Sequence, residues 1–136
     1  MRSETSERWL TVVLRLAGAV LLLAFAAVFL PSHWMEANHA WLGLGTFPRS
    51  PLVEYLTRSI SALYAIKGGL YLVLSTDVAR FAPVIAYVGW TTVAFGLAML
   101  AIDLHAGMPW FWTFAEGPPI LGVGVVLLAL RRRLSR

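Results

Sequence analysis

Residues 51–75, PLVEYLTRSISALYAIKGGLYLVLS, decide the fold class of this chain. An α-helix rises about 1.5 Å per residue, so roughly 20 apolar residues span the hydrocarbon layer of a bilayer. The stretch is long enough to cross, but it also carries Glu54, Arg58 and Lys67. Because charged side chains are costly in hydrocarbon, we expect this helix to lie inside a bundle of membrane helices.

One face of this expected helix combines polar and small residues. They recur at helical spacing and form what we call the polar-and-small stripe: Glu54, Arg58, Ser61, Ala65 and Gly68. Leucines that can meet lipid or apolar neighbours lie elsewhere on the helix: Leu52, Leu56, Leu63, Leu70 and Leu74. The pattern predicts that other helices cover the stripe.

The composition is typical of an integral membrane protein. Of the 136 residues, 59% are hydrophobic and 13% charged, and the mean hydropathy is +0.73, which is too apolar for a soluble domain of this size. The net charge is +4, but the basic residues lie beside apolar segments, which indicates contact with lipid and not with nucleic acid. The chain has no cysteine, so disulfides and thiolate chemistry are excluded.

We expect an all-α fold, a four-transmembrane-helix bundle in a single domain. The four spans cover about residues 9–30, 51–75, 81–104 and 118–133. Residues 24–26, Ala-Phe-Ala, have the form of a signal-peptide cleavage site. Arg15 interrupts that apolar core, and the segment is longer than a usual signal sequence, so we expect it to remain as the first span.

The first connection and the last span need separate interpretations. Residues 32–42 are expected to form a short interfacial helix capped by Ser32, with tryptophans at the head-group level.

The last apolar run is short, roughly 20 Å at the helical rise. Either the arginines after it extend to the head groups, with residues 110–114 as an aromatic belt and outer cap, or these aromatics continue the helix at membrane depth. We expect the first arrangement.

The distribution of basic residues predicts the orientation. One side of the expected bundle carries Arg2, Arg8, Arg80, Arg131, Arg132, Arg133 and Arg136. The loops of the other side carry Arg49 alone. Because basic residues are retained on the cytoplasmic side, both termini should be cytoplasmic, and the three histidines should face outward.

Three groups of polar residues are candidates for function. The first is an intramembrane cluster of Glu54, Arg58 and Asp103, which is either a structural ion pair that fixes helix packing or a binding or proton-relay site. The second lies on the expected outer face: His33, Glu36, His39, His105 and Glu116. The third comprises basic residues placed to contact anionic head groups by extending to the membrane surface: Arg15, Lys67, Arg131, Arg132 and Arg133.

The outer group has the ligand types of a metal site but not the pattern. Imidazole and carboxylate suit zinc, manganese or iron, and His33 and Glu36 would share one face of a helix. No HExxH or ExxH motif occurs in the spans, so the pattern favours a solvated interfacial loop. The sequence requires no cofactor.

Two segments resemble a known family. Residues 14–18, LRLAG, and residues 68–75, GGLYLVLS, followed by a short turn to Arg80, are similar to the DoxX-like group of small four-helix bacterial membrane proteins. The resemblance implies a four-span bundle in a bacterial inner membrane, sometimes associated with redox or quinone-linked complexes. The acidic residue that this group often carries before the paired glycines is replaced here by the segment Tyr64 to Lys67.

No complete set of catalytic residues is present in the sequence. We therefore expect a non-catalytic subunit or accessory protein whose partners are the lipid bilayer and either other membrane subunits or further copies of itself. The alternative is a membrane redox or quinone-linked component, or a protein that binds a small hydrophobe, acting through Glu54, Arg58 and Asp103.

Overall fold

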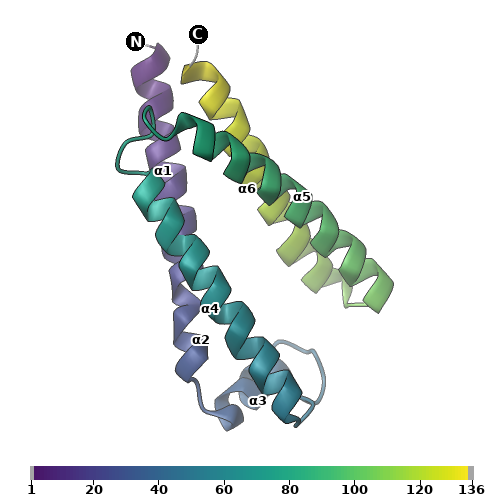
Figure 1. Cartoon of the computed structure of the whole chain (residues 1–136). Coiled ribbons are helices and arrows are strands. Elements are labelled where there is room, and N and C mark those ends of the chain that lie inside the picture. The colour runs from purple at the N-terminus through teal and green to yellow at the C-terminus, as the bar shows by residue number, and fades with distance from the viewer. Residues whose placement is uncertain (1, 135–136) are drawn as a thin grey trace. The chain divides into compact units, whose positions relative to one another are not determined.

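The computed structural model describes residues 2–134, which are predominantly helical (Figure 1). The helices are α1 (Arg2–Leu23), α2 (Phe25–Phe29), α3 (Ser32–Trp41), α4 (Pro51–Leu74), α5 (Ala82–Ala106) and α6 (Trp110–Leu134). They form two compact units. Residues 17–72 make the central unit, and residues 1–16 with 73–136 make the terminal unit, so α1 and α4 each contribute to both.

Within residues 2–134, three helical segments are long and apolar enough to cross a membrane. They are residues Glu4–Phe29, Ala82–Ala106 and Trp110–Leu134. The first combines α1 and α2, which are nearly continuous because the backbone at Ala24 keeps helical angles. The protein is therefore an all-helical membrane protein. Helix α4 has a comparable length of 24 residues but is not among these three segments, because Glu54, Arg58 and Lys67 interrupt its apolar residues, so the expected second span is not confirmed.

Glycines bring two helices of the central unit into close contact. A Cβ added to Gly18 of α1 would lie 2.9 Å from the carbonyl oxygen of Gly68 in α4, and one added to Gly68 would lie 2.7 Å from the carbonyl oxygen of Gly18. Real Cβ atoms essentially never approach so closely. Small residues at such crossings let helix backbones meet in membranes, where association depends on packing.

Burial along α4 follows the expected stripe. Ser61, Ala65 and Gly68 are buried. Four of the five leucines expected to lie elsewhere are exposed: Leu52, Leu56, Leu63 and Leu70. Leu74, which lies in the terminal unit, is buried. The small half of the stripe thus contacts other parts of the protein, as the helical spacing predicted.

Helices α5 and α6 of the terminal unit form an antiparallel hairpin (Figure 1). The turn begins at Gly107, whose φ of 68° is a left-handed conformation that glycine adopts without strain. Glycines again permit close packing along the hairpin. A Cβ on Gly96 would lie 2.6 Å from the nitrogen of Leu121, and one on Gly124 would lie 2.7 Å from the nitrogen of Val93.

The last helix differs from the expected span. Helix α6 begins at Trp110, eight residues before the start of the expected span at residue 118, and continues through Pro118 and Pro119. Residues 110–130, which precede the arginines, correspond to about 31 Å at the helical rise, so the length of the helix before the arginines is sufficient to span the hydrocarbon layer. The aromatics of residues 110–114 form the first turns of a long helix, so the start of the last span expected at residue 118 lies inside this helix.

Backbone hydrogen bonds explain why α6 begins before residue 118. The backbone nitrogens of Trp112 and Thr113 donate to the carbonyl oxygen of Pro109, at 2.9 and 3.2 Å, which begins the helix directly after the turn. Proline lacks an amide hydrogen and is disfavoured inside helices of soluble proteins. In membrane helices an internal proline is tolerated more often.

Helix α3 forms close to the expected range, but its cap differs. Ser32 lies within the helix, the N-cap position is Pro31, and the cap makes no side-chain hydrogen bond. Proline cannot supply a side-chain acceptor, so the start of this helix depends on backbone bonds from Trp34 and Met35 to the carbonyl oxygen of Pro31.

Candidate functional site

The best-connected polar residue of the central unit is Arg58. Its Nη1 donates to the carbonyl oxygen of Val28, and its Nη2 donates to that of Leu30 at 3.0 Å. Val28 and Leu30 lie at the end of α2, where the last carbonyls of a helix have no partner within the helix. Arg58 supplies that partner from 28 to 30 residues further along the chain.

Glu54 lies one helical turn before Arg58. The closest atoms of the two side chains, Oε2 and Nη2, are 3.9 Å apart, and about a third of each side chain is exposed. This contact is the longest and weakest of the three that Arg58 makes, because a partly exposed ion pair at this spacing contributes little to stability. The sequence-predicted pairing of Glu54 and Arg58 is present, but the main contacts of Arg58 are backbone carbonyls.

Asp103, the third member of the expected intramembrane cluster, belongs to the terminal unit. It lies on α5, its side chain is only 3% exposed, and its Oδ2 has no hydrogen-bond partner. Glu116 of α6 is close enough for the two carboxyl groups to interact electrostatically. The Nε1 of Trp112 donates to the Oε2 of Glu116 at 2.7 Å, which fixes this carboxyl group on the helix.

The structure therefore groups Asp103 with Glu116, which the sequence assigned to different clusters. Glu116 was expected in an outer loop, because the helix was expected to start at residue 118. Once α6 starts at Trp110, Glu116 lies within the helix, beside the last turns of α5. Antiparallel pairing across the Gly107 turn was the signal that could have placed the two together.

The residues of the expected outer group make other contacts. Glu36 pairs with Arg49, with 2.6 Å between Oε1 and Nε and 2.8 Å between Oε2 and Nη2. The Nδ1 of His39 lies 3.1 Å from the carbonyl oxygen of Gly45. His33 and His105 are exposed. Over residues 2–134, the structure brings together no group of three or more histidine and acidic side chains that could hold a metal ion.

The candidate head-group residues are dispersed. Lys67 lies 5.8 Å from the ring centre of Tyr71, a cation-π distance. Arg131, Arg132 and Arg133 occupy the last turn of α6, where positive charge complements the helix dipole.

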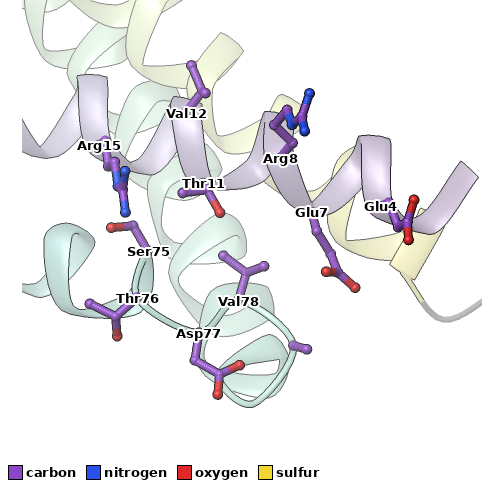
Figure 2. Close-up of a pocket in the computed structure, with 11 residues that line it drawn as sticks. Glu4, Glu7, Arg8, Thr11, Val12, Arg15, Ser75, Thr76, Asp77 and Val78 are labelled. Carbon is purple, nitrogen blue, oxygen red and sulfur yellow. The ribbon is translucent and has the colours of Figure 1, made fainter. Parts of the chain in front are cut away.

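Arg15 lines an open cavity of the terminal unit, between the first turns of α1 and the turn after α4 (Figure 2). This cavity had no signal in the sequence, because residues about 65 positions apart build it.

Comparison of the chain with protein-family models, curated proteins and solved structures gives no match. The site must therefore be interpreted from its own geometry.

Proposed function

We propose that this chain is a non-catalytic subunit or accessory protein of a membrane complex. The observation that carries the proposal is the set of contacts of Arg58. This residue was a candidate for intramembrane chemistry, and its donors are instead directed at the carbonyls that end α2. Such contacts hold backbone in place and leave the guanidinium less available to a substrate.

Two acidic side chains that were candidates for a site also make contacts within the chain, which supports the same proposal. Glu36 is paired with Arg49, and Glu116 accepts from Trp112. Glycines permit close packing of helices within each unit. Large apolar side chains are exposed along the helices, including Phe25, Phe29, Trp90 and Phe114. These surfaces suit lipid, neighbouring subunits or further copies of the chain.

The proposal includes a topology with four spans. We propose that α4 crosses the membrane together with the three more apolar segments, that α3 lies at the outer interface, and that both termini are cytoplasmic. The basic residues on the turn after α4 and at the end of α6 support this orientation. A bacterial inner membrane and a relationship to the DoxX-like group remain predictions from the sequence.

A second candidate function is a redox or hydrophobe-binding component. The buried Oδ2 of Asp103 favours it, because a buried carboxylate oxygen without a partner is costly and often marks a functional position. This function would require Asp103→Asn and Glu54→Gln to reduce activity of the host pathway. It would also predict turnover by the purified chain or a bound metal or cofactor.

The two functions are separated by purifying the chain from its host membranes and, in parallel, after heterologous expression. The accessory role predicts that the host sample migrates as a larger complex on a native gel. It also predicts that the chain alone neither reduces a soluble quinone nor retains metal. Quinone turnover by the chain alone would contradict the proposal and support the second candidate.

A further inference from the structure

An open cavity in the terminal unit has the composition of a binding site. Its volume is about 520 Å³, within the range of about 300 to 1,000 Å³ that is usual for small-molecule sites. Its lining residues come from the first turns of α1 and from the turn between α4 and α5: Glu4, Glu7, Arg8, Thr11, Val12, Arg15, Ser75, Thr76, Asp77, Val78 and Ala79. Figure 2 shows the two segments facing each other.

The cavity carries separated charges of opposite sign. In Figure 2 the side chains of Glu7, Thr11 and Arg15 extend from α1 toward the turn. Neither Glu7 nor Arg15 makes an ion pair or a hydrogen bond with another residue in the described part of the chain. They are eight positions apart, about 12 Å along the helix, which is too far for a direct contact. Glu4 and Arg8, nearer the start of α1, have opposite charges four positions apart.

Hydroxyl groups and a second carboxylate complete the lining. Thr11 and Ser75 lie near Arg15 in Figure 2. Asp77 adds a carboxylate on the turn, and its Oδ1 accepts from the backbone nitrogen of Arg80 at 2.9 Å. That bond orients the turn, and Thr76 stabilises it further by donating to the carbonyl oxygen of Val73 at 2.7 Å.

We propose that this cavity binds the phosphoethanolamine head group of a membrane phospholipid. The phosphate lies on Arg15, with the hydroxyl of Thr11, and the primary ammonium lies on Glu7 and Asp77. Arginine binds phosphate through parallel N–H donors, and carboxylates accept from an ammonium group. The inference rests on the membrane location included in the proposed function.

The order of the charges along α1 supports this occupant. The apolar span runs from Glu4 to Phe29, so Arg15 lies deeper in the membrane than Glu7. In a phospholipid the phosphate is attached to the glycerol and lies nearer the acyl chains, whereas the ammonium lies outside it. The order of the two charges along α1 therefore matches the order of the phosphate and the ammonium in the lipid head group.

The charges also predict which phospholipid head groups the cavity should bind weakly. A choline head group carries methyl groups in place of ammonium hydrogens and cannot donate to Glu7 or Asp77. A glycerol head group has no positive charge, so it leaves those carboxylates without a counterion. Soluble glycerophosphoethanolamine has the same donors and acceptors as the lipid and differs from it in lacking acyl chains.

The test measures lipid binding by the purified full-length chain in detergent. Native mass spectrometry would quantify binding of phosphatidylethanolamine, phosphatidylcholine and phosphatidylglycerol with identical acyl chains, and of glycerophosphoethanolamine. We expect phosphatidylethanolamine to bind most tightly. Arg15→Gln should weaken this binding about tenfold or more, the change expected when a charge-assisted hydrogen bond is lost, and Arg15→Lys should weaken it less.

Glu7→Gln separates the ammonium contact from the phosphate contact. It should reduce the affinity for phosphatidylethanolamine to that for phosphatidylcholine, whose own affinity should not change. The control is Arg80→Gln, which removes an exposed arginine of the same turn that does not line the cavity and should leave binding unchanged.

Equal affinity for the three lipids would overturn the proposal, as would unchanged lipid binding by an Arg15→Gln protein that keeps its helical circular dichroism. Binding of glycerophosphoethanolamine as tightly as the lipid would overturn the assignment to a membrane lipid. All measurements use the isolated chain, so failure of the accessory role would not alter them.

Discussion

Gly18 and Gly68 face each other so closely that a Cβ added to either would lie within 3 Å of the other residue's carbonyl oxygen. The contact joins α1 to α4, the helix that carries Glu54, Arg58 and Lys67. Backbone contact at this point keeps α4 against an apolar span in spite of Glu54, Arg58 and Lys67.

Gly68→Ala should destabilise the protein. The added methyl group would meet the carbonyl oxygen of Gly18 at 2.7 Å and the nitrogen of Leu22 at 2.8 Å, so backbone must move. Overpacking of this kind costs about 1–3 kcal/mol. Thermal unfolding in detergent measures it, and Gly69→Ala is the matched control because no atom lies within 4 Å of its added Cβ. Equal melting temperatures of the two variants would contradict the close contact.

Gly124→Ala should separate α5 from α6. Its Cβ would lie 2.7 Å from the backbone nitrogen of Val93. Gly122→Ala, two positions away, meets no atom within 4 Å and should stabilise α6 slightly, since alanine favours a helix over glycine by about 1 kcal/mol. The melting temperature should therefore fall for the first variant and stay level or rise for the second. The reverse order would contradict the packing of this hairpin.

Arg58→Gln should destabilise the central unit more than removal of an exposed ion pair does. It leaves the carbonyls of Val28 and Leu30 without the guanidinium, and hydrogen bonds to charged groups contribute about 1.5–3 kcal/mol. Arg49→Gln is the comparison, because Arg49 pairs with Glu36 but its side chain is 82% exposed, and such pairs contribute about 0–1 kcal/mol. Chemical denaturation followed by circular dichroism would rank the two. A larger loss for Arg49→Gln would contradict the role given to Arg58.

Asp103→Asn should be tolerated if the accessory role is right. The substitution removes the electrostatic interaction with Glu116 and replaces a buried carboxylate whose Oδ2 has no partner. We expect an unchanged or higher melting temperature and unchanged assembly with the host complex. Loss of host-pathway activity by a stable Asp103→Asn protein would instead support the second candidate function.

The sequence predicted the parts of the fold that depend on helical periodicity. The stripe of α4 could be predicted because burial repeats with the helical turn, and α3 could be predicted because polar turns flank it. The start of α6 could not, because Pro118 and Pro119 have opposite meanings in soluble and membrane helices. Because the start of α6 was not predicted, the proximity of Asp103 and Glu116 was not predicted either.

The contacts of Arg58 and the cavity beside Arg15 could not be predicted from the sequence either. Arg58 was expected to pair with Glu54 at helical spacing, but no local pattern shows that a helix ends near it in space. The cavity depends on how residues 75–79 approach the first turns of α1, and that approach follows from tertiary packing. The sequence predicted the local pair of Glu54 and Arg58, whereas the contacts of Arg58 with backbone carbonyls depend on tertiary packing.

The central claim is that α4 crosses the membrane, and cysteine labelling tests it most directly. The chain contains no cysteine, so Thr46→Cys before α4 and Ala79→Cys after it each introduce a single exposed thiol. In intact cells, a membrane-impermeant maleimide should label the cysteine at position 46, and it should label the one at position 79 only after permeabilisation. Labelling of both positions from the same side of the membrane would show that α4 does not cross, and it would contradict the four-span account.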